Sequence, residues 1–118
     1  MTPTELLAAL EAATGPSREL DAEIAASEKW TRFSDYWLSP SGRQRQYHPP
    51  AYTASLDSAL TLVPEGRMWF VGHMDPSDMR YAATISEIGN IGAALWRGVH
   101  ATPALALVIA AIRARGEG

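Results

Sequence analysis

The sequence contains no cysteine, and this absence excludes disulfides, thiolate-bound metals and cysteine nucleophiles. It also lacks a long hydrophobic run, because the longest apolar stretch, residues 101–112, is too short to span a bilayer. The first residues lack the basic stretch and continuous apolar core of a signal peptide. We therefore expect a cytoplasmic protein without a membrane segment.

The chain also lacks a strong excess of charge of either sign. The formal net charge is −3, which argues against binding of DNA or RNA over the whole surface. The chain has 118 residues, of which 47% are hydrophobic and 19% are charged. These values are typical of one globular domain that buries its own core. We therefore expect a single domain over residues 1–118.

Motifs for catalysis and for cofactors are missing too. Ser55 does not lie in the G-x-S-x-G pattern of hydrolases, and its position with Asp57 is typical of a helix start. The glycines between residues 89 and 98 have no Walker lysine and no dinucleotide-binding context. We therefore expect a protein that is not an enzyme and that binds no cofactor.

The three histidines leave one alternative open. His48, His73 and His100 have none of the short helical or strand spacings that preform a metal site. His73 and His100 are both expected near strand ends, so they can meet in space. The simpler interpretation is a pair of polar strand ends at a solvated sheet edge, and we expect no metal.

Periodicity and capping residues predict an α+β fold. Apolar residues at helical spacing predict helices over 2–13, 17–28, 53–63 and 102–115, the third of them capped by Thr53. Strands are predicted over 67–73, 79–86 and 94–100, and residues 30–48 form either a two-stranded ribbon or an ordered loop. The expected architecture is an α-β-α sandwich, a small and mainly antiparallel sheet with helices packed on both faces. Because its apolar positions exceed one stripe, the last helix is expected to be among the most buried elements.

Aromatic residues and arginines are what the sequence does supply. Both residue types are enriched at interfaces, and both stack on nucleobases. Arginine also pairs with phosphate through two parallel hydrogen bonds. The competing interpretation is that the tryptophans are core residues and the arginines are solvated. The candidate ligand-binding residues are Trp37, Arg43, Arg45, Tyr47, Arg67, Trp69 and Arg97.

Three blocks of the sequence resemble a known family. They are "PPAYTASLDSALTLVPEG" at 49–66 with a tryptophan at 69, "ATPALALVIAAIRAR" at 101–115, and "ELDAEIA" at 19–25. Together they resemble the phage ABA sandwich domain proteins, which are small proteins of bacteriophages and prophages. The resemblance implies helices on both sides of a sheet and a location in the bacterial host. It implies no activity and no functional residues.

These observations lead to a function hypothesis with two alternatives. We expect a phage-encoded accessory protein that acts in counter-defence by sequestering a small nucleotide signal. A domain of this size seldom encloses such a ligand alone, so we expect a homo-oligomer with a pocket between subunits. The alternatives are a virion or assembly component and a protein-binding inhibitor of a host factor.

Overall fold

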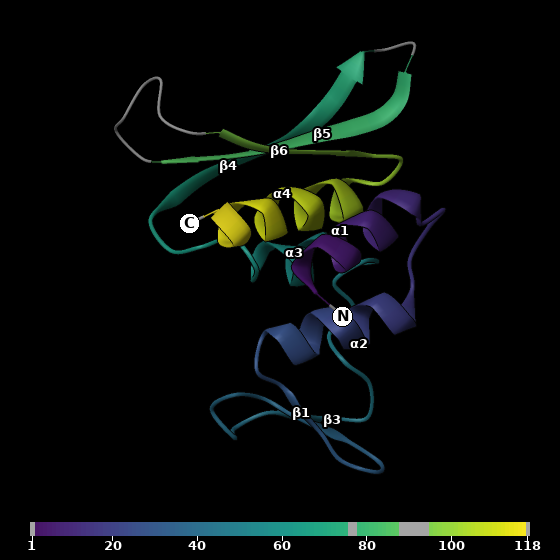
Figure 1. Cartoon of the computed structure of the whole chain (residues 1–118), viewed down its shortest axis with the longest axis vertical. Coiled ribbons are helices and arrows are strands. Elements are labelled where there is room, and N and C mark those ends of the chain that lie inside the picture. Colours follow the sequence, from purple (N-terminus) through teal and green to yellow (C-terminus); the bar gives the residue numbers. More distant parts are fainter. Residues whose placement is uncertain (1, 76–77, 88–94, 118) are drawn as a thin grey trace.

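The computed structural model describes residues 2–75, 78–87 and 95–117, and this part of the chain holds four helices and six strands (Figure 1). The class is α+β, as predicted. The predicted glycine-rich connection at 89–92 lies outside the described residues. In chain order the elements are α1 (Pro3–Ala12), α2 (Arg18–Ser27), β1 (Thr31–Arg32), β2 (Trp37–Leu38), β3 (Arg45–Gln46), α3 (Leu56–Leu60), β4 (Arg67–Asp75), β5 (Asp78–Glu87), β6 (Leu95–His100) and α4 (Pro103–Glu117).

Three of the helices begin where their capping residues predict. Thr2, Ser17 and Thr102 precede α1, α2 and α4, and each hydroxyl accepts a hydrogen bond at 3.2 Å from the amide three residues further on. Each such bond satisfies one of the amides that a helix start leaves without a partner.

The third helix begins later than predicted and is shorter. Its cap is Ser55, whose hydroxyl accepts a hydrogen bond from the Ser58 amide at 3.3 Å, and the helix spans only Leu56–Leu60. The prediction that Thr53 caps this helix is wrong. Thr53 is instead fully buried, and it joins the segment before α3 to the start of α2.

Asp21 and Thr53 form the centre of this junction. The amide and the hydroxyl of Thr53 both donate to Oδ1 of Asp21, at 2.8 and 2.9 Å. The Thr53 hydroxyl oxygen also accepts from the Ser17 amide at 2.8 Å. Burial raises the pKa of the Asp21 carboxyl, while the two hydrogen bonds from Thr53 act in the opposite direction. A buried carboxylate therefore depends on one threonine for its hydrogen bonds.

The larger sheet has the strand order β4-β5-β6 and is antiparallel throughout. The predicted hairpin and third strand are confirmed, and β4 and β5 are longer than predicted. The register pairs Trp69 with Ile85 and Ile85 with Trp96, so these three residues share one face. Met68 and Phe70 lie on the opposite face, as the predicted alternation requires.

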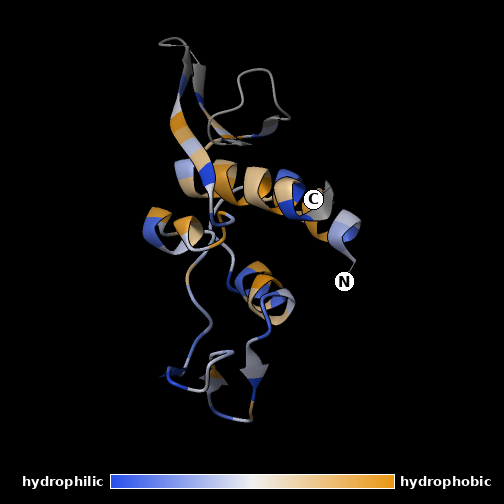
Figure 2. Cartoon of the chain, turned by 90° about the vertical axis from the view of Figure 1, so that its left-hand side faces the viewer, coloured by the Kyte–Doolittle hydropathy of each residue, from blue (hydrophilic) through white to orange (hydrophobic). Residues whose placement is uncertain are grey.

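Helix α4 covers the first of these faces. The residues from Ala104 to Ile112 are all buried, which confirms the prediction that this helix is among the most buried elements. Figure 2 shows the long hydrophobic stretch of α4 directly under the sheet. A Cβ added at Gly98 in β6 would lie 2.1 Å from the carbonyl oxygen of Ala106. The backbones of β6 and α4 are therefore too close for any side chain between them. No described helix is both long and apolar enough to cross a membrane.

The order of layers differs from the predicted sandwich. In Figure 1 the larger sheet lies at one end, followed by α4, then α1 and α3, then α2, and finally the small sheet β1-β2-β3. All four described helices thus lie on one side of the larger sheet, between two sheets. Helices on both faces of a sheet are not confirmed. Residues 30–48 form three short strands rather than the two-stranded ribbon that we considered.

The Asp21–Thr53 junction generates a prediction about stability. Thr53→Val keeps the side-chain shape but removes the hydroxyl, so the Asp21 carboxylate loses a donor and the Ser17 amide loses its acceptor. We expect the free energy of unfolding to fall by about 1–3 kcal/mol in urea denaturation, the usual cost of unsatisfied buried groups. The matched control is Thr61→Val, because the Thr61 hydroxyl bonds only to Ser58 O in an exposed turn. Equal losses in both variants would contradict this account.

Candidate ligand-binding surface

The small sheet presents an aromatic and basic surface at one end of the molecule. Strand β2 pairs with both β1 and β3, and Trp37 lies opposite Arg32 on one side and Gln46 on the other. The turn between β1 and β2 is closed by a hydrogen bond from Phe33 N–H to Tyr36 O, at 2.8 Å. The second turn contains Gly42 at φ 75°, a left-handed conformation that glycine adopts without strain.

Ring stacking and a cation–π contact fix the side chains on one part of this surface. The rings of Phe33 and Tyr36 are stacked, with centroids 4.8 Å apart. The Arg45 guanidinium lies 4.1 Å from the centroid of the Tyr36 ring. Arg32 is placed in the same way at 5.6 Å over Trp37. Guanidinium groups therefore already lie over aromatic rings here, and both kinds of group are able to stack on a base.

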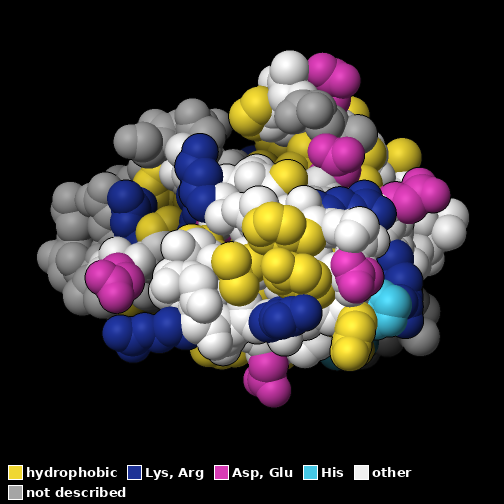
Figure 3. Space-filling view, turned by 90° about the horizontal axis from the view of Figure 1, so that it is seen from below, with side chains coloured by type: hydrophobic (Ala, Val, Ile, Leu, Met, Phe, Trp, Pro, Cys, Tyr) yellow, Lys and Arg dark blue, Asp and Glu magenta, His cyan; other side chains and the backbone are white. Residues whose placement is uncertain are grey.

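Tyr47 borders several hollows on this surface. Its side chain is 84% exposed, which is far above the usual exposure of a large aromatic residue. It forms part of the wall of three hollows. One of them, of about 180 Å³, lies between Tyr36, Arg45, Gln46 and Tyr47. Figure 3 shows this end of the molecule, where hydrophobic side chains gather in the middle and both basic and acidic side chains lie around them.

A second hollow adjoins Tyr47 and is lined by two guanidinium groups, where the first has one. It measures about 270 Å³ and is lined by Arg18, Arg32 and His48, with Glu19 as its one carboxylate among the lining residues. Arg18 Nη1 lies 2.9 Å from Nδ1 of His48. Since arginine only donates, Nδ1 accepts and the proton of a neutral imidazole is on Nε2. This N–H is a further donor beside two guanidinium groups.

The charge of this region has the opposite sign to that of the whole chain. Residues 29–48 contain four basic residues and one acidic residue, which gives +3, whereas the whole chain carries −3. The rest of the chain is therefore clearly acidic. The basic residues of this segment favour anions near the small sheet, and Glu19 and Glu28 border the same hollows.

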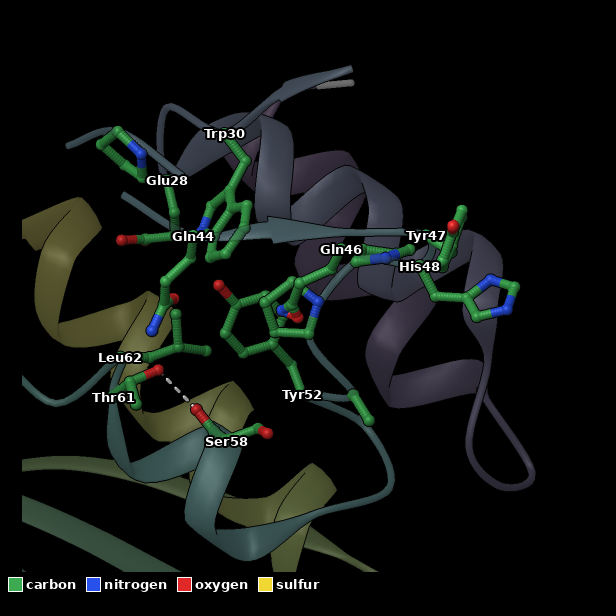
Figure 4. Close-up of a pocket in the computed structure, with 14 residues that line it drawn as sticks. Glu28, Trp30, Gln44, Gln46, Tyr47, His48, Tyr52, Ser58, Thr61 and Leu62 are labelled. Carbon is green, nitrogen blue, oxygen red and sulfur yellow. Dashed lines mark hydrogen bonds between the residues drawn. The ribbon is translucent and has the colours of Figure 1, made fainter. Parts of the chain in front are cut away.

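A third and larger hollow of about 860 Å³ lies between the small sheet and α3 (Figure 4). None of its lining residues is an arginine or lysine, so it suits an anion less than the neighbouring hollow does. Tyr52 lies inside it, whereas Tyr47 and His48 lie at its far side. Burial, and next the negative charge of Glu28, raise the pKa of Tyr52 to about 12. Tyr52 is therefore a neutral phenol at physiological pH.

The residues considered for catalysis or metal binding are engaged elsewhere. Ser55 caps α3, as the interpretation of a helix start predicts, and His48 contacts Arg18. His100 is buried and its Nε2 donates to Ala13 O at 2.6 Å, while its Nδ1 accepts from the Ala101 amide. His73 packs on the Tyr81 ring. Within the described residues no cluster of histidine and carboxylate side chains is able to hold a metal ion.

The structure divides the seven predicted ligand-binding residues between the two ends of the molecule. Arg43, Arg45, Tyr47 and Trp37 belong to the small sheet and its turns, but Trp37 is only 6% exposed. Arg67, Trp69 and Arg97 belong to the larger sheet, where Arg67 stacks on Trp96 at 4.7 Å. Within one chain the two groups do not meet.

The predicted ligand-binding residues did not include Arg18, Arg32 or His48, and His48 was considered only for catalysis or metal binding. Arg18 is 30 residues from His48 in the sequence, and only the fold brings the start of α2 next to the segment after β3. Arg32 was predictable from the sequence, because it lies within the same aromatic segment as Tyr36 and Trp37.

Comparison of the chain with family models, curated proteins and solved structures finds no match. The resemblance to phage ABA sandwich proteins therefore stays a prediction.

The environment of Tyr52 generates a prediction about pH. The pKa of Tyr52 is higher in the folded chain than its ordinary value of 10.0, so the folded state keeps the phenol proton up to a higher pH. The stability contribution of this group is complete below about pH 10 and is lost as the pH rises to about 12. We measure the absorbance at 295 nm after a rapid pH jump and subtract the value for Tyr52→Phe from that for wild type. We expect this difference to rise with a midpoint near pH 12.

In denaturant the same difference should have a midpoint near 10, the ordinary value. A difference with this lower midpoint in the folded protein would show that Tyr52 is not buried as described.

Proposed function

We propose that this protein binds a small anionic molecule that contains a nucleobase, and that it does so at the small sheet without turnover. Each of the two smaller hollows beside Tyr47 has a volume below the usual lower limit for a ligand pocket, which is about 300 Å³. A nucleotide that extends across Tyr47 would occupy both. Its base would lie on the Tyr36 side, and its phosphate would lie on the Arg18 side.

The observation that carries this proposal is the stacked pair of Arg45 and Tyr36 next to the exposed Tyr47 ring. A base between Tyr47 and this pair would gain ~1–3 kcal/mol from stacking. Tyr36 and Arg45 already have fixed orientations, so little side-chain entropy would be lost on binding.

Three groups around the second hollow suit a phosphate. Arg18 and Arg32 supply guanidinium donors, and the His48 Nε2–H adds a neutral donor. Arg18 is also the first residue of α2, and a helix N-terminus favours negative charge. Glu19 in the same hollow acts against a highly charged ligand. We therefore favour a ligand with few phosphates, such as a mononucleotide or a cyclic nucleotide.

Sequestration without turnover fits the chemistry of these side chains. The surface offers stacking and anion-binding groups, and the one shifted tyrosine nearby is held in its neutral form. The resemblance to phage proteins adds a biological setting, in which a homo-oligomer in the cytoplasm of a bacterial host disarms a nucleotide signal of the host. The resemblance also implies an α-β-α sandwich, which stays a prediction for this chain.

The test is calorimetry against a panel of linear and cyclic mono- and dinucleotides. We expect at least one member to bind more tightly than about 10 μM, which corresponds to about 7 kcal/mol. Tyr47→Leu and Arg45→Gln should each weaken it about tenfold or more, since a stacking contact is lost. The matched control is Arg97→Gln, which removes the same charge at the other end of the molecule and should leave the affinity unchanged.

Two results would contradict the proposal. One is the absence of binding by every nucleotide at this affinity, in which case a virion component or an inhibitor of a host protein becomes the better hypothesis. The other is an equal loss in Arg97→Gln, which would place the ligand away from the small sheet.

A further inference from the structure

Strand β4 carries three consecutive large apolar side chains that remain exposed. Met68 is 54% exposed, Trp69 48% and Phe70 67%. In a strand, consecutive side chains point to opposite faces, so Trp69 lies on the α4 side while Met68 and Phe70 lie on the other side. Both faces of the sheet are therefore apolar and open at the same strand.

The place of β4 in the sheet explains this exposure. It is at the edge of the order β4-β5-β6, and α4 packs mainly over β6 and β5. The free side of β4 also presents backbone amides and carbonyls that no described strand pairs with. Proteins usually protect such edges with charged side chains, proline or a β-bulge. The register shift of β4 lies between His73 and Asp75, and the stretch from Met68 to Gly72 has none of these features.

We infer that β4 is the contact through which two copies of this chain associate, by antiparallel pairing of β4 with β4 of the second copy around a two-fold axis. This arrangement would produce one continuous six-stranded sheet. A two-fold axis places the same strand on both sides of the contact, so a single apolar strand is complementary to itself.

Edge pairing is favoured for two reasons over packing of the sheet faces that α4 does not cover. Face-to-face packing would cover Met68 and Phe70 but would leave Trp69 half exposed on the α4 side. Edge pairing brings side chains of both faces against their counterparts, and it satisfies the free backbone groups as well. It therefore accounts for all three exposed residues with one contact.

The available area lies at the low end of the range for dimers, so the contact is expected to be weak. Trp69 and Phe70 alone expose roughly 200–300 Å² per copy, given that an aromatic side chain covers about 150–250 Å². Met68 and the edge of a nine-residue strand add to this. A standard interface uses about 800 Å² per partner, so a strand-to-strand contact lies at or below this size.

The residues around Phe70, on the sheet face that α4 does not cover, allow a second strand to approach β4 closely. Phe70 bends over Gly72, where an added Cβ would lie 3.0 Å from the ring. The cross-strand neighbours of Phe70 and Gly72 on β5 are Thr84 and Ala82, which are both small. The aromatic ring thus lies low on the sheet, and a second strand is able to approach the edge without a bulky obstacle. This contact lies at the opposite end of the molecule from the proposed nucleotide site and does not depend on it. The proposed site lies within one chain, so this contact would not form the pocket between subunits that the sequence led us to expect.

The first experiment measures mass in solution by sedimentation equilibrium. We expect wild type to be a dimer at tens of micromolar concentration. Trp69→Lys and Phe70→Lys should each raise the dimer dissociation constant about 30-fold or more, the effect of losing a central contact. Phe33→Lys is the matched control, since Phe33 is also an exposed aromatic, at 43%, but lies on the small sheet. Far-UV circular dichroism confirms that each variant is folded.

The second experiment locates the contact. Because the chain has no cysteine, Val71→Cys in β4 and Val99→Cys in β6 each introduce a single thiol. With a short bifunctional maleimide, we expect Val71→Cys to form a covalent dimer and Val99→Cys to stay monomeric on a denaturing gel. A monomeric wild type, or a dimer that Trp69→Lys and Phe70→Lys leave intact, would overturn the inference. Cross-linking of Val99→Cys in place of Val71→Cys would also overturn it, because it indicates face-to-face packing.

Discussion

The approach of α4 to β6 is the constraint on which the rest of the structure depends. At Gly98 the two backbones are so close that a methyl group would overlap Ala106 O and lie 2.8 Å from Ala110 N. This contact holds the helix flat against one face of the larger sheet. The opposite side of α4 is buried by α1 and α3, so the helix has no solvent-facing stripe between Ala104 and Ile112. Arg115 extends from its last turns to Glu28 and Leu62 O, and thereby fixes the end of α2 and the segment after α3.

Much of this architecture was predictable because it depends on local signals. Thr2, Ser17 and Thr102 mark helix starts through hydrogen bonds within one turn, and β4 and β5 alternate in register. Thr53 shows where local reasoning fails. A threonine before an apolar run is typical of a cap, yet its hydroxyl bonds to Asp21, which is 32 residues away. The same limit explains why helices on both faces were predicted but are not confirmed. The sequence of the larger sheet does not reveal which of its faces the helices cover.

The candidate site was predicted only in part, for a related reason. Arg45 and Tyr47 are close in sequence and remain close in the fold, so the aromatic and arginine pattern found them. Trp37 belongs to the same pattern but is buried, because composition does not separate a core tryptophan from an exposed one. The tryptophan and arginines of the larger sheet lie at the other end of a molecule 43 Å long. The two ends therefore serve different purposes in our account, one for an anionic ligand and one for a second copy.

The most direct test of the central claim is the stability of Gly98→Ala against Gly15→Ala. An alanine at position 15 meets nothing within 4 Å, whereas one at position 98 meets the backbone of α4. Urea denaturation should show a loss of about 3 kcal/mol or more in unfolding free energy for Gly98→Ala, since α4 must move away from the sheet. Gly15→Ala should differ from wild type by no more than about 0.5 kcal/mol. Similar stability of both variants would contradict the claim that this contact holds the helix against the sheet.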